Sequence, residues 1–426
     1  MQSQKADDSW SFKELSRTQT SYLTHGYHRY AAKFIPQLVE RLIKENSQNA
    51  DLVCDPFMGS GTTLVEAIIN GRRAYGTDIN PVAVLISRAK TTPIEPLFLK
   101  HHVSSLLGKI KSDIESKKGQ KLLVSEDIDI NVSENKRLDY WFPEKQKKDL
   151  VIILSRIYAI DDQKVQTFLL CAFSNILKAC SRWMMKSVKP TRDKNKAIAN
   201  AYKSFILQTR RMIIGNEEFW KRVNGKEVNC RVDNSDARKM KIKDGSITLI
   251  VTSPPYVTSY EYADLHQLTT IWLENIGNMS EFRSKFLRSI QKCDNDDDHG
   301  KLYSDLGRET VNKLRLIDKR ESNDVERYFY EMQQSFQEMH RVLKQGGRAS
   351  IVIGDTDLKK VKIKNSEVFA EIMQEIGFKV RNIILRPIPS KILPLTRDER
   401  TGRFSSKVTA DRLAYPTESI LIMEKI

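Results

Sequence analysis

Short apolar stretches that end in turn residues recur along the 426-residue chain and predict buried β-strands. Helical periodicity separates most of these stretches, and such alternation is typical of a mostly parallel sheet with helices on both faces. The last two predicted strands have no helix between them, which indicates an antiparallel pair at one edge. The predicted strands are Asp51–Asp55, Ala74–Ile79, Val228–Val232, Ile247–Ser253, Arg348–Gly354, Val380–Leu385 and Ser419–Met423. The predicted helices are Thr62–Asn70, Asn80–Ala89, Val325–Leu343 and Ser366–Ile376.

A long region of helical pattern interrupts the alternation between about Leu97 and Lys226. A crossover between neighbouring strands normally needs a few tens of residues at most. We therefore expect an inserted helical subdomain at residues 97–226, with residues 1–96 and 227–426 forming the domain that carries the sheet. The second half of the insert, Arg182–Lys226, carries 12 Lys and Arg residues against 3 Asp and Glu residues.

Composition narrows the class of protein. The chain has 70 Lys and Arg against 54 Asp and Glu, a net charge of +16, which favours a polyanionic partner. No apolar run approaches the roughly 20 residues of a membrane helix, and the polar N-terminus lacks the apolar core of a secretory signal. We therefore expect a cytosolic protein with no membrane partner. Five cysteines without CxxC pairs argue for free thiols, against a disulfide scaffold and against a structural zinc site.

The segment Asp55–Thr63, DPFMGSGTT, follows a predicted strand and opens a predicted helix. Its glycines allow close approach of the backbone to a ligand, and a helix N-terminus offers free N–H groups, as in nucleotide-type cofactor sites. Asp55 could pair with an ammonium group, and Asp78, at the end of the next strand, could bind ribose hydroxyls. Both acids could instead be helix caps. The absence of a GxxxxGK[ST] pattern argues against a triphosphate site.

A second motif, Thr252–Tyr256 (TSPPY), directly follows the strongest strand pattern. Two prolines cannot continue a central strand, so they impose a rigid turn at the carboxyl edge of the sheet. This turn would fix the Ser253 hydroxyl and the Pro254 carbonyl and would present the Tyr256 ring; an ordinary turn with a packed tyrosine is the alternative. Asp236, after the third strand, could accept a hydrogen bond from an adenine amino group or could lie in a surface turn.

Together, DPFMGSGTT and TSPPY resemble the motifs of the amino-group DNA methyltransferases that use S-adenosylmethionine. TSPPY is similar to the cytosine-N4 branch, whereas adenine-N6 enzymes usually carry DPPY or NPPY. The stretch Thr24–Pro36 (THGYHRYAAKFIP) resembles the segment that closes over the methionine end of the cofactor. The resemblance extends to VLKQGG at 342–347 and to the closing strand ESILIMEKI, and it covers roughly residues 20–95 and 227–426. The insert lies where the family's usual arrangements place no target-recognition segment, which leaves its role open.

The resemblance implies an α/β fold of the Rossmann-like class I methyltransferase type, with an antiparallel edge strand. It implies S-adenosylmethionine as cofactor, released as S-adenosylhomocysteine, no metal, and duplex DNA as partner in a prokaryotic cytosol, with a cognate restriction endonuclease as a possible companion. The implied cofactor-binding residues are Lys33, Phe34, Asp55, Pro56, Phe57, Gly59, Gly61, Thr62, Asp78, Ile79 and Asp236. The implied catalytic residues are Ser253, Pro254, Pro255 and Tyr256.

In this interpretation the target cytosine is flipped out of the duplex. The Ser253 hydroxyl and the Pro254 carbonyl hold its amino hydrogens, which aims the nitrogen lone pair at the methyl group, and Tyr256 stacks on the base. Three other functions remain open: adenine-N6 methylation, methylation of an RNA amino group, and DNA binding with a decayed cofactor site. The sequence shows no RNA-recognition signature, and every required motif position is present.

The basic half of the insert is expected to form one wall of a DNA cleft, because phosphate contacts are made by Lys and Arg. A solvated helical decoration is the alternative, since charge runs often serve solubility. A second basic segment, the 391–412 loop, is a further candidate. The expected DNA-binding residues are Lys189, Arg192, Lys194 and Lys196 in the insert, and Arg400 and Arg403 in the loop.

Overall fold

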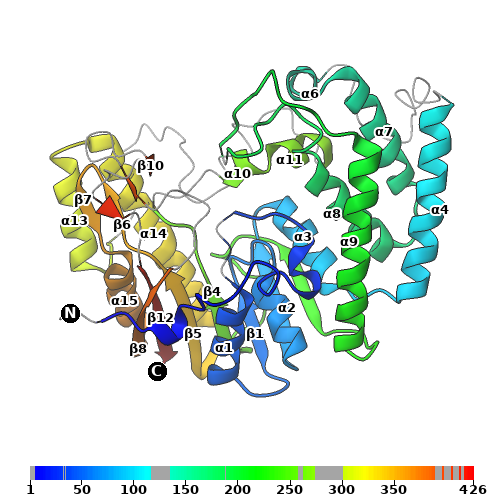
Figure 1. Cartoon of the computed structure of the whole chain (residues 1–426). Coiled ribbons are helices and arrows are strands. Elements are labelled where there is room, and N and C mark those ends of the chain that lie inside the picture. Colours follow the sequence, from blue (N-terminus) through cyan, green and yellow to red (C-terminus); the bar gives the residue numbers. More distant parts are fainter. Residues whose placement is uncertain are drawn as a thin grey trace.

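The computed structural model describes residues 5–31, 33, 35–116, 135–187, 189–257, 262–273, 301–388, 396–397, 404–405, 412–413 and 417–426. A seven-stranded sheet with the order β3-β2-β1-β4-β5-β12-β8 lies at its centre (Figure 1). In that order the strands are β3 Cys230–Asn234, β2 Arg73–Asp78, β1 Leu52–Asp55, β4 Ile247–Thr252, β5 Leu343–Ile353, β12 Thr417–Lys425 and β8 Phe378–Pro387. All seven predicted strands are confirmed, with ends that differ by a few residues.

The pairing of the strands explains where a ligand can bind. Strands β3, β2, β1, β4 and β5 are parallel, whereas β12 runs against both of its neighbours, β5 and β8. The predicted antiparallel pair at one edge is confirmed, with β8 outermost. The chain builds outward from β1 to β3 on one side and from β4 to β5 on the other. Ligands of such sheets bind beyond the carboxyl ends of the strands at this switch point, here between β1 and β4.

Apolar side chains on the two faces of the sheet build two separate cores, because successive residues of a strand point to opposite faces. Val53 belongs to the core under the first group of helices, and Cys54 belongs to the core under the second group. The first group is α1 Pro36–Asn46 and α2 Thr62–Ile69. The second group is α13 Asp305–Arg315, α14 Lys319–Val342 and α15 Asn365–Ile376. The four predicted helices are confirmed as α2, α3 (Pro81–Thr91), α14 and α15.

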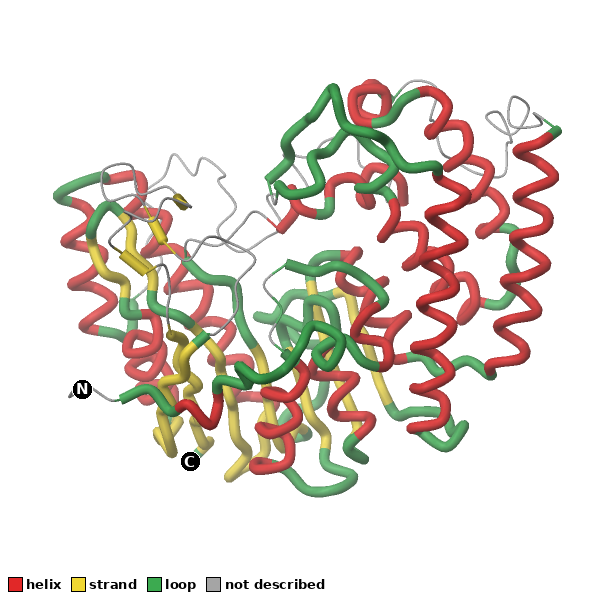
Figure 2. The backbone as a smooth tube through the Cα atoms, in the orientation of Figure 1, coloured by secondary structure: helices red, strands yellow, loops and turns green. Residues whose placement is uncertain are grey.

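The region predicted as a helical insert forms a layer beyond α3, on the right in Figures 1 and 2. Its helices are α4 Pro96–Glu115, α6 Lys136–Trp141, α7 Glu144–Tyr158, α8 Gln163–Ile176 and α9 Ala201–Arg222. Their buried side chains form a third core, which also includes Val82 and Ile86 of α3 and Trp272 of α11 (Gln267–Leu273). The insert is therefore packed directly against the sheet-bearing part of the chain.

The expectation that the insert is helical throughout is wrong between α8 and α9. The described residues from Ser181 to Asn200 form turns, joined by an isolated β-bridge between Trp183 and Arg192. The indole of Trp183 donates to the Lys189 carbonyl, and its ring stacks on Trp141 at a centroid distance of 5.4 Å. These contacts hold an irregular basic segment against the helices in place of a continuous helix.

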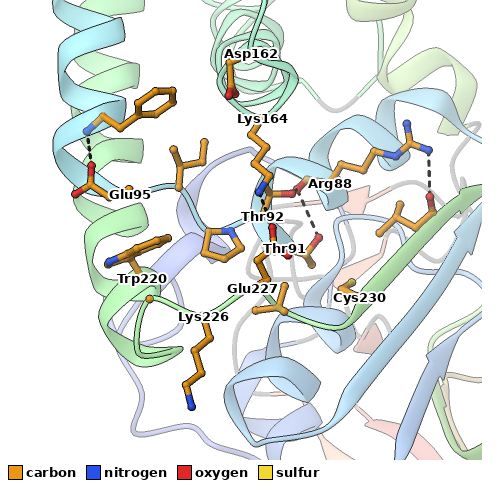
Figure 3. Close-up of a pocket in the computed structure, with 16 residues that line it drawn as sticks. Arg88, Thr91, Thr92, Glu95, Asp162, Lys164, Trp220, Lys226, Glu227 and Cys230 are labelled. Carbon is orange, nitrogen blue, oxygen red and sulfur yellow. Dashed lines mark hydrogen bonds and ion pairs between the residues drawn. The ribbon is translucent and has the colours of Figure 1, made fainter.

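Two connecting segments join the insert to the sheet, and both line a crevice of about 560 Å³ (Figure 3). The outgoing connection includes Thr92 and Glu95, and the returning one includes Lys226 and Glu227. The side-chain amide of Asn216 pairs with both the N–H and the carbonyl of Ile94, at 3.0 and 2.7 Å. None of the residues predicted to be catalytic or cofactor-binding lines this crevice.

The remaining described elements are short. They are the 3-10 turns Asp8–Trp10 and Leu23–Gly26, α10 Tyr262–Leu265, β6 Thr356–Leu358, β7 Val361–Ile363, β9 Thr396–Arg397, β10 Phe404–Ser405 and β11 Arg412–Leu413. None of the described helices is both long and apolar enough to cross a lipid bilayer. Cys54, Cys171, Cys180 and Cys230 are free thiols, and Cys293 lies outside the described residues.

Candidate active site

The DPFMGSGTT segment forms a tight loop between β1 and α2 that only glycine accommodates at two positions. Gly59 and Gly61 have φ of 47° and 72°, in the left-handed region that other residues rarely adopt. A Cβ at Gly61 would lie 2.8 Å from the Ser87 hydroxyl oxygen, and one at Gly59 would lie 3.0 Å from the Tyr30 ring. Two predicted cofactor-binding residues, Gly59 and Gly61, therefore shape this loop at the switch point of the sheet.

Asp78 fastens the end of β2 to this loop. Its carboxylate accepts hydrogen bonds from the Gly59 N–H at 3.0 Å and from the Asn80 N–H at 2.9 Å. The alternative assignment as the cap of α3 is wrong, because Asn80 caps that helix through the Val82 N–H. Burial raises the pKa of Asp78 to about 6. The side chain is nevertheless partly exposed, as a contact to a ligand requires.

Asp55 links the two predicted motifs to each other. Its Oδ1 accepts hydrogen bonds from the Thr252 hydroxyl at 2.6 Å and the Phe57 N–H at 3.1 Å, and its Oδ2 accepts one from the Thr63 hydroxyl at 2.8 Å. Because the carboxylate is buried and occupied by three donors of the chain, we assign it to positioning rather than to direct contact with an ammonium group. Burial raises its pKa to about 6. It is not a helix cap, since Gly61 occupies the N-cap of α2.

The TSPPY turn leaves the carboxyl end of β4 beside the glycine loop. Ser253 is partly exposed, and Pro254 behind it is buried. The Pro255 carbonyl accepts a hydrogen bond of 2.8 Å from the Tyr328 hydroxyl, which anchors the turn to α14. The ring of Tyr256 packs over Gly354 at the end of β5. The predicted catalytic residues are therefore presented on a turn that two neighbouring elements support.

Two residues from the edge of the sheet complete this support and escaped the sequence analysis. The Tyr256 hydroxyl lies 3.4 Å from Oε2 of Glu418, whose Oε1 accepts a 2.7 Å hydrogen bond from the guanidinium of Arg386. Arg386 is buried, so the ion pair with Glu418 compensates its charge. A pairing between positions so distant in sequence leaves no local signal.

Asp236, which was predicted to receive an adenine amino group, already has a partner within the chain. The carboxylate is engaged by Arg238, which donates to it from Nε, from Nη2 and from its backbone N–H. This pairing lowers the pKa of Asp236, despite the opposing effect of its burial. The same guanidinium also lies 3.5 Å from Glu331 on α14. In the structure the Asp236 carboxylate therefore stabilises the turn after β3.

Two lysines lie near the glycine loop, of which Lys90 is buried and Lys33 is partly exposed. The ammonium of Lys90 donates to the Ser60 carbonyl at 2.9 Å, and that of Lys33 donates to the His25 carbonyl at 3.0 Å. Burial lowers the pKa of both lysines, and the charge of Lys33 lowers that of Lys90 further. The buried hydroxyls of Ser60 and Thr62 have no hydrogen-bond partner among the described residues. This donor set fits a carboxylate, such as the one at the methionine end of S-adenosylmethionine.

The remaining predicted cofactor residues lie in this loop, except for Ile79, which follows β2, and Phe34. Pro56 and Thr62 are buried, whereas Phe57 and Ile79 are partly exposed. Phe34 lies outside the described residues. Among the described residues, no group of three or more His, Cys, Asp and Glu side chains could hold a metal ion.

A buried carboxyl that the sequence analysis missed docks the N-terminal segment onto α2. Oε1 of Glu66 accepts from the Tyr22 hydroxyl at 2.6 Å and lies 2.7 Å from Nε2 of His25. Both Glu66 and His25 are fully buried. Burial raises the pKa of Glu66 to about 8 and lowers that of His25 well below its usual value. The pair is therefore held in its neutral forms near neutral pH.

This arrangement predicts a pH-dependent stability. A carboxyl whose pKa is higher in the folded than in the unfolded chain stabilises the fold at low pH, and that stabilisation is lost as pH rises through about 8. We expect the free energy of unfolding of the wild type to fall more steeply between pH 5 and 9 than that of Glu66→Gln, by at most about 1.4 kcal/mol per pH unit, and its Tm to fall more steeply as well. Asp55 and Asp78 are present in both proteins, so their contributions to the pH dependence cancel in the comparison. Thermal unfolding across this range, with exposed Glu45→Gln as control, measures the difference; equal slopes would contradict the assignment.

The predicted DNA-binding residues of the insert divide into two groups. Lys189 and Lys194 are exposed, whereas the guanidinium of Arg192 lies over the Tyr140 ring, 4.4 Å from its centroid. Lys196 does not fit the prediction: its ammonium donates to the carbonyls of Lys178, Ser181 and Trp183 at 2.6–2.8 Å and so holds the irregular segment together. Arg400 and Arg403 lie outside the described residues.

The chain is similar to known DNA methylases. A family model described as DNA methylase, of the N6/N4 methyltransferase type, matches residues 1–89 and 247–426, which leaves the insert outside the match. The Type II methyltransferase M.MvaI of Kocuria varians is 27% identical over 96% of this chain and 94% of its own length. M.BsoBI of Geobacillus stearothermophilus, also a Type II methyltransferase, is 23% identical over 94% and 85%.

Among solved structures, the YcgJ protein of Bacillus subtilis aligns over 91% of this chain and 97% of its own, with 10% identity and a TM-score of 0.33. The family match covers more than half of the chain and includes both the glycine loop and the TSPPY turn. The chain therefore belongs to the N6/N4 family of DNA methylases.

Proposed function

We propose that this chain transfers a methyl group from S-adenosylmethionine to the exocyclic N4 of cytosine in duplex DNA. The observation that carries this proposal is the hydrogen bond of 2.6 Å between Asp55 and Thr252, which joins the glycine loop to the TSPPY turn at the switch point of the sheet. A site for the methyl donor and a site for the acceptor are thereby built on neighbouring strands. Both of the full-length relatives above are Type II methyltransferases, which supports a role in a restriction-modification system.

The chain offers separate contacts for the carboxylate, the ribose and the portion of the cofactor between them. Lys33 and the hydroxyls of Ser60 and Thr62 suit the carboxylate of its methionine portion, and Asp78 suits the ribose hydroxyls. The backbone of the glycine loop supports the portion between them, where a side chain at Gly59 would meet Tyr30. S-adenosylmethionine supplies an electrophilic methyl group on a sulfonium.

The lone pair of the cytosine amino nitrogen is delocalised into the ring, so the enzyme must localise it on the nitrogen before transfer. We assign the two amino hydrogens to the Ser253 hydroxyl oxygen and the Pro254 carbonyl, which would bend the nitrogen towards tetrahedral geometry. Alignment of this kind supplies about 7–11 kcal/mol in the best intramolecular reactions. Tyr256, fixed by Gly354 and Glu418, provides the face on which a flipped base stacks.

The experiment that tests the overall activity uses purified protein and radiolabelled S-adenosylmethionine. Label should pass to duplex DNA of mixed sequence and accumulate at one short target, and should not pass to RNA of the same sequence. Transfer to RNA alone would contradict the proposal. Binding of DNA without any transfer would support a non-enzymatic protein with a decayed cofactor site.

The basic segment of the insert gives a prediction about DNA affinity. Each phosphate contact contributes about 0.9 to the slope of log affinity against log salt concentration. We expect Lys189→Gln with Lys194→Gln to weaken binding to every duplex and to make that slope shallower by up to about 2. Cofactor affinity should not change.

The matched control removes the same charge elsewhere on the insert. Lys109→Gln with Lys111→Gln alters two exposed lysines of α4, the outermost helix in Figure 1. Affinity of each variant for duplex DNA is measured between about 50 and 200 mM salt, the range in which phosphate contacts weaken. If the first pair has the same slope as wild type, the segment around Lys189 is not the DNA-binding wall.

A further inference from the structure

A buried hydroxyl of the insert lies between the two segments that frame the proposed active site. Ser174 of α8 is 2.9 Å from Nε2 of His28 and 2.8 Å from Oγ1 of Thr269. His28 belongs to the N-terminal segment that docks over the glycine loop, and Thr269 lies on α11, which follows the TSPPY turn along the chain. All three side chains are less than 10% exposed. The insert thus contacts both the N-terminal segment and α11 through one polar junction.

The direction of each hydrogen bond in this junction follows from the chemistry of its groups. Nδ1 of His28 lies 2.7 Å from the Arg29 carbonyl, which can only accept, so Nδ1 carries the proton. Burial lowers the pKa of His28 to about 3, so the ring is neutral and its Nε2 accepts from the Ser174 hydroxyl. The Ser174 oxygen then accepts from Thr269. Removing this one hydroxyl leaves a buried acceptor and a buried donor unpaired.

Tyr30 lies where this junction meets the cofactor loop. It follows His28 by two residues, and its ring lies against Gly59, where an added Cβ would be 3.0 Å away. The other side of the junction also reaches it: the ring of His266, one turn before Thr269, packs on Tyr30 at a centroid distance of 5.0 Å. The Tyr30 ring is thus positioned from both sides.

The backbone leading to Tyr30 is also held by the insert. The Arg29 N–H donates to Oδ1 of Asn175 at 3.1 Å, and the Tyr27 carbonyl accepts from Nε2 of Gln208 at 2.6 Å. Asn175 and Gln208 bond to each other at 2.8 Å, which ties α8 to α9. The segment over the glycine loop is therefore fixed by two helices of the insert.

We propose that Ser174 is a positioning residue for the cofactor: it holds Tyr30 against the glycine loop from the insert. The insert is then part of the cofactor site as well as a DNA-binding wall, and its placement sets the affinity for S-adenosylmethionine. This inference rests on the proposed function, since it takes the glycine loop as the site of that cofactor.

The test is Ser174→Ala, with cofactor affinity measured by calorimetry using S-adenosylmethionine alone. We expect the Kd to rise by roughly tenfold, the equivalent of 1.4 kcal/mol. In steady-state assays KM for the cofactor should rise similarly, while kcat at saturating cofactor stays within about twofold. Loss of a hydroxyl that only stabilises the fold would not raise KM for the cofactor while leaving kcat unchanged. Thr269→Ser should keep wild-type affinity, and the isosteric Thr269→Val should reproduce the defect.

The control is Ser155→Ala, which removes another buried serine hydroxyl from the insert, on α7. If Ser155→Ala and Ser174→Ala raise the Kd equally, or if Ser174→Ala leaves it unchanged, the positioning role is wrong. Thermal unfolding of both variants identifies any common loss of stability. Wild-type protein that fails to bind S-adenosylmethionine would overturn the proposed function itself, which distinguishes that failure from a failure of Ser174.

Discussion

Ser253→Ala should retain cofactor binding and lose about 10²–10³ of kcat. Removing one preorganised hydrogen-bonding group at a reacting centre typically has an effect of this size. The side chain is partly exposed at the end of β4, and no described contact of the fold depends on its hydroxyl. The loss should therefore appear in turnover and not in the unfolding temperature.

The measurement is single-turnover methyl transfer to duplex DNA, alongside calorimetry with S-adenosylmethionine. Ser246→Ala is the matched control, because Ser246 precedes the same strand at its opposite end and bonds only locally, to the Lys243 carbonyl. Near-wild-type turnover by Ser253→Ala would remove the hydroxyl from the mechanism. The Pro254 carbonyl would then be the sole candidate acceptor of the motif.

Asp78→Ala should weaken binding of S-adenosylmethionine by about 10²-fold or more. Hydrogen bonds to a charged acceptor contribute roughly 1.5–3 kcal/mol each, and two ribose hydroxyls can donate to this carboxylate. Part of the effect should come from the loop, because Asp78 also accepts from the Gly59 N–H. The helix that follows should survive, since Asn80 caps α3 independently.

Calorimetry with S-adenosylmethionine measures this loss, and methyl transfer at saturating cofactor should recover most of kcat. Asp161→Ala provides a control, as Asp161 is exposed in the loop between α7 and α8 of the insert. An unchanged cofactor Kd would show that Asp78 neither contacts the cofactor nor shapes the glycine loop for it.

The sheet and both motifs were predictable from the sequence because their signals are local. Each buried strand is a short apolar run, and each motif begins where such a run ends. Parallel strands bring their carboxyl ends to one edge, so the distance of 2.6 Å between Asp55 and Thr252 follows from the strand order once β1 and β4 are neighbours. The spacing of the two residues along the chain carries no such information.

Two of the predicted contacts fall on polar groups that already have partners in irregular backbone. Asp236 was expected to bind a ligand, but the turn after β3 places Arg238 against it. Lys196 was expected near phosphates, but the segment after α8 folds back and surrounds its ammonium with carbonyls. Neither turn has a periodic pattern from which its conformation could be predicted.

Two kinds of functional residue were missed, for different reasons. Arg386 and Glu418 support Tyr256 across strands that are distant in sequence, so no local pattern indicates them. Glu66 did leave a signal: it is the one ionisable residue in the apolar helix TTLVEAII, and a buried polar group needs a hydrogen-bond partner. That partner, His25, lies in the segment Thr24–Pro36 that resembles the family's cofactor-closing segment.

The central claim is that the methylated atom is N4 of cytosine, and analysis of the product tests it most directly. The chain is expressed in a host that does not methylate its own DNA. That DNA is hydrolysed to nucleosides, which are identified by mass spectrometry. We expect N4-methyldeoxycytidine, and none from the same host expressing Ser253→Ala. N6-methyldeoxyadenosine in its place would contradict the cytosine assignment while leaving the fold, the cofactor site and the family intact.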